Sequence, residues 1–302
     1  MYRDIHIFVF SYNRAVFLDN CLKSIRDCAA HCKVTIIDDH SSDLSTLEVI
    51  DKWREFHDVY MPVKSKEAYK TGGLYNNMNQ AMILANEKGL KYALFIQDDM
   101  QFIRKLKESD IQDIHVFYSK NKNVVQYDTN FMKFDSTPNS LYLDQSGKGY
   151  LKSLDFHYSG FTALGVFHVE RFFNLFGEFK SSERQNDMYA RTKGVQRGYA
   201  RNPFMMWLPN PVSHRGKKRT LKLKITEKLS GAGYYPYHYM SDSEASYFRK
   251  RKHDEYPIAR HYLNCTGLSN NKQWAFVGGT SALYEQGGWK RTAGRFLSKL
   301  GF

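Results

Sequence analysis

The chain has 302 residues with a formal net charge of +13, and 42% of its residues are hydrophobic. A chain of this length forms either two domains or one domain with an elaboration. Its sequence contains neither a run of 18 apolar residues nor a signal peptide, so we expect a cytoplasmic protein rather than a secreted or membrane-spanning one. The four cysteines lack metal-site spacing, which indicates reduced thiols rather than a disulfide framework.

The charge is distributed unevenly along the chain. Residues 215–302 contain 17 Lys and Arg against 6 Asp and Glu, so they carry +11 of the total, whereas residues 1–214 carry only +2. We therefore divide the chain into a nearly neutral part, 1–214, and a basic, aromatic-rich C-terminal extension, 215–302.

Three apolar segments in the first hundred residues predict strands that are covered on both faces. They are 5–10, 33–37 and 92–96. Apolar residues near a 3.6-residue period predict helices between these strands, over 16–28, 44–56 and 76–88. The alternation of strands and helices indicates a parallel, right-handed βαβ sheet.

Polar residues follow each of the three strands directly. They are Ser11-Tyr12-Asn13-Arg14, Asp38-Asp39-His40 and Gln97-Asp98-Asp99. Open α/β sheets bind ligands at the carboxyl ends of their strands, so we expect one nucleotide site at this edge. Adjacent carboxylates repel each other and lose solvation there, which favours a cation between Asp98, Asp99 and the ligand. Their oxygens suit Mg²⁺ or Mn²⁺ carrying a diphosphate, although a helix cap or loop explains the Asp-Asp pair equally well when taken alone.

The second half of the predicted site begins with a strand over 161–167 and a helical segment over 169–176. Polar residues then lead to Asp187 at a predicted helix N-terminus, where dipole stabilisation alone would also favour a carboxylate. A further strand, 203–209, leads to His214, whose neutral imidazole is an acceptable ligand for Mn²⁺. The basic residues at 215–219 either offset the charge of a diphosphate or form a solvated loop.

Four segments, taken in order, resemble the GT-A glycosyltransferases of the family-2 type. The segments are Phe10-Ser11-Tyr12-Asn13-Arg14, Ile37 to Asp43, Gly72-Gly73 with Asn77 and Asn79, and Gln97-Asp98-Asp99. The resemblance covers roughly the first 210 residues. It implies a GT-A fold: a mostly parallel α/β sheet with flanking helices, a nucleotide-binding half over 1–100 and an acceptor half over 101–214.

The resemblance also implies roles for individual residues. Asp39 should accept hydrogen bonds from the base or ribose of a nucleotide, Asp98 should lie near the ribose and the metal, and Asp99 should be the main metal ligand. The general base should be Asp187. The other expected cofactor-binding residues are Tyr12, Arg14, Gly73 and Asn79, and the other expected metal ligand is His214.

Three positions depart from the family pattern. His40 replaces the usual Gly or Asn, so we expect a turn that differs in detail. Ile96 and Gln97 occupy the places of the first acid in the longer metal motif, and Asn186 stands where Glu is common.

These features together indicate an inverting, metal-dependent sugar transferase. Asp187 would take the proton of the attacking hydroxyl, and Mn²⁺ or Mg²⁺ would stabilise the nucleoside diphosphate that leaves. The expected donor is a UDP-sugar, because the family most often uses one. The expected acceptor is a saccharide or a lipid-linked molecule in polysaccharide or glycoconjugate synthesis.

Three alternatives remain open on sequence grounds. A nucleotidyltransferase on a similar sheet would require a Gly-rich phosphate loop after the first strand, and residues 10–14 at that position contain no Gly. A nucleic-acid-binding protein would fit the basic and aromatic residues, but no recognised binding motif supports a specific nucleic-acid partner. A noncatalytic scaffold for an acidic partner would not need the retained acids at 39, 98, 99 and 187.

The C-terminus predicts a basic amphipathic helix. Its apolar face consists of Trp289, Ala293, Phe296, Leu297 and Leu300. Arg291, Arg295 and Lys299 form a stripe on another face, the pattern of a helix that lies on an anionic membrane. We therefore expect either peripheral membrane contact through 289–302 or docking of the apolar face on the protein's own core. The tyrosine cluster at 234–239 fits sugar stacking or core packing.

Overall fold

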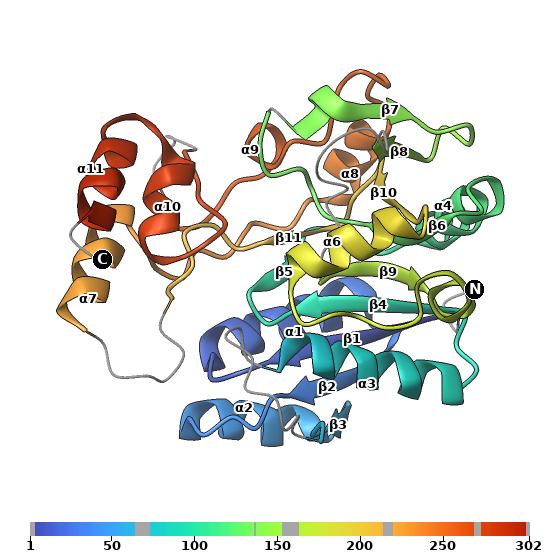
Figure 1. The fold of residues 1–302 in the computed structure, drawn as a ribbon, viewed down its shortest axis with the longest axis horizontal. Coiled ribbons are helices and arrows are strands. Elements are labelled where there is room, and N and C mark those ends of the chain that lie inside the picture. The colour runs from blue at the N-terminus through green and yellow to red at the C-terminus, as the bar shows by residue number, and fades with distance from the viewer. Residues whose placement is uncertain are drawn as a thin grey trace.

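The computed structural model describes residues 4–63, 73–135, 137–152, 163–213, 220–268 and 273–299 (Figure 1). Its centre is a nine-stranded sheet with the order β3-β2-β1-β4-β9-β6-β10-β8-β7. The strands of its first half are β1 (Ile5–Ser11), β2 (Lys33–Asp38), β3 (Asp58–Tyr60) and β4 (Tyr92–Gln97). The others are β6 (Val124–Asp128), β7 (Leu141–Leu143), β8 (Gly149–Lys152), β9 (Gly165–His168) and β10 (Gln196–Ala200).

Most strands of this sheet run in the same direction. β3, β2, β1 and β4 are mutually parallel, and β10 is parallel to β6. β9 lies antiparallel between β4 and β6, so those two strands share one direction, and β8 is the other strand that runs against the rest. The expectation of a mostly parallel α/β sheet with flanking helices is confirmed.

Helices cover both faces of the sheet because its strands alternate their side chains between two cores. Ile7 and Val9 of β1 point to the side of α1 (Ala15–Ala29), α2 (Leu44–Arg54) and α4 (Glu108–Lys120). Phe8 and Phe10 point to the side of α3 (Leu74–Glu87) and α6 (Glu183–Thr192). The helices predicted over 16–28, 44–56 and 76–88 therefore exist, with shifts of a residue or two at their ends.

The segment predicted as a helix over 169–176 is less regular. It forms a short α-helical turn, α5 (Val169–Arg171), and a π-helical turn, η3 (Phe172–Phe176), which ends at Gly177 with φ of 90°. The strand predicted over 161–167 is observed as β9, and residues 161 and 162 lie outside the described part of the chain.

A small second sheet continues from the acid pair. β5 (Met100–Phe102) begins immediately after Asp99 and pairs antiparallel with β11 (Met205–Trp207), so that Trp207 lies opposite Met100. The strand predicted over 203–209 thus joins the two halves of the sequence beside the predicted metal site.

The C-terminal extension contains five helices within its described residues. They are α7 (Leu221–Ser230), α8 (Asp242–Arg249), α9 (Ala259–Tyr262), α10 (Gly279–Gln286) and α11 (Gly288–Lys299). Tyr237, Phe248 and Trp274 share a hydrophobic cluster with Phe131 and Leu208, so the compositional division at residue 214 does not separate two cores. Figure 1 shows α7, α10 and α11 grouped at one side of the molecule. No helix in the ranges given above combines the length and apolarity that crossing a bilayer requires.

The tyrosine cluster divides between core and surface. Tyr237 is buried and donates its hydroxyl hydrogen bond to the Trp207 carbonyl oxygen at 2.9 Å. Tyr234 and Tyr239 remain exposed by 40% and 43%. Among these three residues, core packing therefore accounts for Tyr237 alone.

Candidate active site

The polar residues that follow the strands meet at one edge of the sheet. β1, β2, β4 and β6 run in the same direction, so their carboxyl ends lie together. Hydrogen bonds continue the register beyond the strands: the Asp39 amide donates to the Ser11 carbonyl at 2.9 Å and the Asp98 amide to the Phe10 carbonyl at 3.0 Å. This edge is the expected ligand side of an open α/β sheet.

Asp39 is held in place by the start of α3. Its carboxylate accepts hydrogen bonds from the Gly73 amide at 3.1 Å and from the Asn77 side-chain amide at 2.9 Å. The neighbouring Asp38 is fully buried and accepts instead from the amide and hydroxyl of Ser41. Asp39 remains half-buried, so it is the acid of this pair that a ligand can reach.

Gly73 is required by a close approach. A Cβ at this position would lie 2.5 Å from Asp39 Oδ1, a contact that real Cβ atoms do not make. The backbone of Gly73 has φ of −80°, which any residue tolerates, so the constraint is space rather than conformation.

We expect Gly73→Ala to displace the Asp39 carboxylate while α3 stays folded, because the clash is local. Loss of one hydrogen bond to a charged group corresponds to roughly tenfold weaker nucleotide binding. Isothermal titration with UDP and GDP measures this loss. Asn86→Ala, near the other end of α3, is the control, because its side chain is exposed and lies away from Asp39 in the sequence of the helix. Unchanged affinity in Gly73→Ala would separate Asp39 from nucleotide binding.

Both ends of the Asn79 side-chain amide form hydrogen bonds within the protein. Its side-chain amide donates to the Phe179 carbonyl at 3.0 Å, and its oxygen accepts from the Phe179 amide at 2.7 Å. Both ends of the amide therefore tie α3 to the loop before α6. Asn77, two residues earlier and 3% exposed, is the asparagine that contacts Asp39, and we add Asn77 to the candidate donor-binding residues.

The loops after β1 and β2 are joined by Asn13, whose side-chain oxygen accepts from the Ser42 amide at 2.8 Å and the Asp43 amide at 3.0 Å. His40 has φ of 58°, and its ring contacts the Pro62 carbonyl oxygen at 2.8 Å. Gly and Asn favour the same left-handed region. The histidine thus occupies a backbone conformation that those residues also adopt easily.

The acid pair is occupied by a cation of the protein itself. Arg14 Nη1 forms ion pairs with Asp98, at 3.4 Å, and with Asp99, and its Nη2 donates to the Val212 carbonyl at 2.9 Å. Burial opposes the charged guanidinium, but the fields and hydrogen bonds of the two acids raise the pKa of Arg14 above its usual value. The Tyr12 amide adds a hydrogen bond to Asp98 at 3.3 Å. Tyr12 and Arg14 thus contact the expected metal ligands.

The acid pair also fits a divalent cation. Asp99 Oδ1 is buried and has no hydrogen-bond partner among the described residues. An uncompensated carboxylate oxygen of this kind is a suitable ligand for Mg²⁺ or Mn²⁺. Those residues contain no group of three His, Cys, Asp or Glu that could hold a metal unaided, and His214 lies outside them. A cation here would need ligands from a bound donor and would displace contacts of Arg14.

Asp187 lies in the second turn of α6 and is 5% exposed. The helix is capped by Ser182, whose hydroxyl accepts from the Gln185 amide at 3.3 Å. The dipole effect decays beyond the first turn, so helix stabilisation alone explains this carboxylate poorly. The neighbouring Asn186 has a structural role: its side-chain amide donates to the carbonyl oxygens of Lys180 and Ser182, both at 3.0 Å, and so holds the loop before α6.

The end of β6 carries an acid that is not among the site residues predicted above. Asp128 is buried and forms an ion pair with Arg197 of β10. The field of Arg197 reaches Lys152, as does that of Asp187. The fields of Asp128 and Asp187 both act on Tyr199, so the end of β6, the strand β10 and Asp187 share one region. Residues 124–128 show a weaker form of the pattern of the first strands, a mostly apolar run that Gln126 interrupts and that ends in Asp, and that pattern is the signal for this position.

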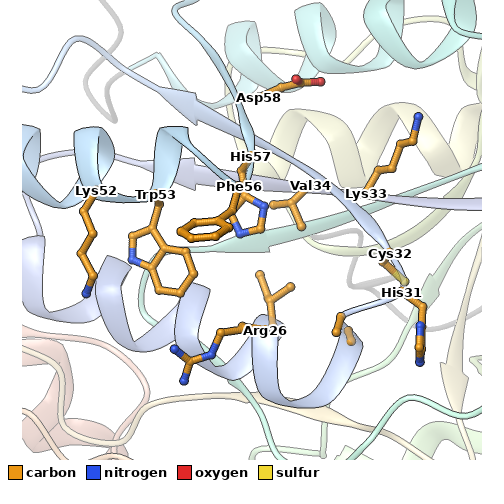
Figure 2. A pocket seen from close by; sticks show the side chains of 13 residues that line it. Arg26, His31, Cys32, Lys33, Val34, Lys52, Trp53, Phe56, His57 and Asp58 are labelled. Carbon is orange, nitrogen blue, oxygen red and sulfur yellow. The ribbon is translucent and has the colours of Figure 1, made fainter.

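A pocket of about 630 Å³ lies elsewhere, between the ends of α1 and α2 and the start of β2 (Figure 2). Trp53 and His57 stack in it with ring centroids 5.6 Å apart. Lys33 and Val34 line it from the amino end of β2, the opposite end from the acids. Ligands of open α/β sheets bind at the carboxyl ends, so we place the active site at the acidic edge despite the size of this pocket.

Comparison with known proteins identifies the class of this chain. The model for glycosyl transferase family 2 matches residues 6–164, more than half of the chain, and the chain belongs to that family. A search of curated proteins finds no match.

Solved structures of similar fold share little sequence with this chain. S. aureus TarS has a TM-score of 0.48 and 14% identity, over 69% of this chain and 37% of TarS. TarS 1–349 in complex with UDP has a TM-score of 0.47 and 12% identity, over 82% of this chain and 69% of that one. The mannosyltransferase PcManGT from Pyrobaculum calidifontis, in complex with GDP-Man and Mn²⁺, has a TM-score of 0.45 and 13% identity, over 82% and 65%. The chain thus spans well under half of full TarS.

Proposed function

We propose that this chain transfers a sugar from a nucleotide diphosphate sugar, with a UDP-sugar as the favoured donor, to a hydroxyl group with inversion. The supporting observation is the convergence at one sheet edge of Asp39, oriented by α3, and the pair Asp98 and Asp99. We place the acceptor, a saccharide or lipid-linked molecule of polysaccharide or glycoconjugate synthesis, on the side of Asp187.

In this proposal the nucleotide half binds the donor through hydrogen bonds. The Asp39 carboxylate accepts from the base or ribose, since carboxylates are acceptors and these groups carry N–H and O–H donors. Asp98 and Asp99 would hold Mn²⁺ or Mg²⁺, which would supply charge stabilisation to the departing diphosphate. Arg14 keeps the two carboxylates compensated in the protein without ligand.

The acceptor half supplies the base. Asp187 accepts the proton of the attacking hydroxyl as the hydroxyl oxygen bonds to the anomeric carbon. Attack opposite the leaving diphosphate inverts the configuration at that carbon. Burial of Asp187 excludes bulk water from the proton acceptor, which limits transfer of the sugar to water.

Thermal-shift screening of nucleotide sugars tests the donor class. We expect stabilisation by one group of nucleotide diphosphate sugars, increased by Mn²⁺. UDP-sugars and GDP-mannose are the first compounds to compare. Absence of stabilisation by any of them, in the presence and absence of Mn²⁺, would contradict the proposed function.

The C-terminal helix supports a second part of the proposal, peripheral contact with an anionic membrane. The predicted apolar face is divided: Leu297 is buried, as is Gly294 beside α10, whereas Trp289 and Phe296 are exposed by 66% and 63%. By helical periodicity the exposed aromatic pair lies beside the stripe that contains Lys299. An aromatic and basic face of this kind fits a lipid surface.

We expect protein that lacks residues 289–302 to co-sediment less with vesicles containing anionic lipid than the full chain does. Each basic residue near such a surface contributes about 1 kcal/mol. Leu297 is buried, so the deletion also removes packing within the protein. The double substitution Trp289→Ser and Phe296→Ser changes exposed side chains alone and is therefore the more specific variant. Neutral vesicles are the control. Equal binding of all forms to anionic vesicles would exclude this helix as the anchor.

A further inference from the structure

Lys133 is a cation that the proposed reaction does not yet use. It lies five residues beyond the end of β6, and its Nζ is 3.8 Å from the centroid of the Trp207 ring. Hydrogen bonds fix the backbone just before it: the Phe131 amide donates to the Met205 carbonyl at 3.1 Å, and the Ala259 amide donates to the Met132 carbonyl at 2.9 Å. The backbone that leads to Lys133 is therefore fixed by the fold, and the ammonium group lies over the Trp207 ring.

The surroundings of Lys133 leave its charge incompletely compensated. The side chain is half-buried and forms no ion pair within the part of the chain that the structure describes. Burial lowers the pKa of Lys133, although the fields of four carboxylates oppose the shift. These acids are Glu285, Glu183, Asp99 and Asp128. An ammonium group that has lost water without gaining an ion-pair partner is ready to bind an anion.

The location of Trp207 indicates which anion reaches this ammonium group. Trp207 pairs with Met100, the residue after Asp99, and the Leu208 amide donates to the Asp99 carbonyl at 2.8 Å. Backbone pairing thus fixes Trp207, whose ring contacts Lys133, beside the acid pair. Arg197, in contrast, already forms an ion pair with Asp128. Among the described residues, Lys133 is a basic side chain that lies in the fields of both Asp99 and Asp128 and forms no ion pair of its own.

We propose that Lys133 binds the diphosphate of the nucleotide donor and stabilises it as the leaving group. The inference rests on the proposed function. In the transfer step, the bond between the anomeric carbon and the diphosphate oxygen breaks, and that oxygen keeps the electron pair. The acceptor oxygen forms the new bond and its proton goes to Asp187, while Lys133 remains protonated and offsets the charge that develops on the diphosphate.

Binding of phosphate-bearing probes to the full chain tests this inference. Isothermal titration of wild type, Lys133→Met and Lys133→Arg compares UDP, GDP, uridine and inorganic pyrophosphate, each with and without Mn²⁺. Methionine is unbranched like lysine and only one atom shorter, so it removes the charge while leaving an apolar side chain beside Trp207, and we expect an unchanged thermal midpoint. Lys105→Met is the control, because Lys105 is exposed and its ion pair, with Asp242, lies on the surface.

We expect Lys133→Met to bind the nucleoside diphosphate and pyrophosphate about 10- to 100-fold more weakly, the range for a hydrogen bond to a charged group. Uridine should bind equally to all variants, and Lys133→Arg should recover part of the loss. Equal affinity of Lys133→Met and wild type for the nucleoside diphosphate would overturn the inference while leaving the proposed function in place. A wild-type chain that binds no nucleoside diphosphate would overturn both.

A phosphate on the acceptor is the other source of such an anion. Titration of glycerol 3-phosphate into protein saturated with the nucleoside diphosphate distinguishes the two. If Lys133→Met lost only this interaction, the assignment to the donor would be overturned in favour of the acceptor.

Discussion

Replacement of Asp187 by Asn is expected to reduce sugar transfer by about 10²–10⁴-fold, the usual contribution of a positioned general base. The substitution keeps the size of a side chain that is 5% exposed, so donor binding and folding should persist. Turnover with saturating acceptor, measured beside calorimetric donor affinity, separates the two effects. Glu178→Gln is the matched control, because it removes an exposed carboxylate paired with Lys180 just before α6.

Near-normal turnover of Asp187→Asn with saturating acceptor would remove this residue from the chemistry. Attention would then pass to Asp128, the buried acid at the end of β6. Asp128→Asn is the less clean variant, because it also leaves the buried Arg197 without its ion-pair partner.

Asp99→Asn should abolish the donor binding that Mn²⁺ supports. The substitution removes one of the two carboxylate charges that face the ion, and a hard divalent cation depends on such ligands. Calorimetric titration of UDP, with Mn²⁺ or with a chelator, measures the metal-supported part of the affinity directly. Asp51→Asn is the control, because Asp51 lies on the surface of α2, where it forms an ion pair with Arg54.

The affinity of Asp99→Asn in chelator separates two causes of such a loss. If that variant and wild type bind UDP equally without metal, the loss with Mn²⁺ belongs to the ion. Unchanged affinity with Mn²⁺ would exclude Asp99 from the site. A drop in both conditions would show that the released Arg14 disturbs the pocket, and a rescue by Arg14→Met would then identify the cause.

The sequence predicts the strands and the acids at their ends because both depend on local patterns. An apolar run followed by Asp is visible without any partner, whereas the segment 124–128, which Gln126 interrupts, carries a weaker form of this signal and is not among the predicted strands. Which of Asn77 and Asn79 contacts Asp39 depends instead on which side of α3 faces β2, and the observed hydrogen bonds show that it is Asn77. The family motif, Gly72-Gly73 followed by Asn77 and Asn79, does not indicate which asparagine contacts Asp39.

The sequence does not predict contacts between segments that are far apart along the chain. Arg14 meets Asp98 and Asp99 across more than eighty positions, and Lys133 meets Trp207 across more than seventy. No periodicity in a single segment encodes such pairs. The C-terminal helix is an intermediate case: its existence follows from its pattern, whereas the split of its apolar face depends on the packing of α10.

The small sheet formed by β5 and β11 has a consequence for how the protein acquires its site during synthesis. Residues 98 and 99 leave the ribosome early, but the strand that pairs beside them and the carbonyl of Val212 that fixes Arg14 follow more than a hundred positions later. Domains form from the N-terminus onward, and contacts of long sequence separation form slowly. The acids at 98 and 99 therefore emerge before the segments that hold them in place, and under the proposed function donor binding would develop only after those later segments have folded.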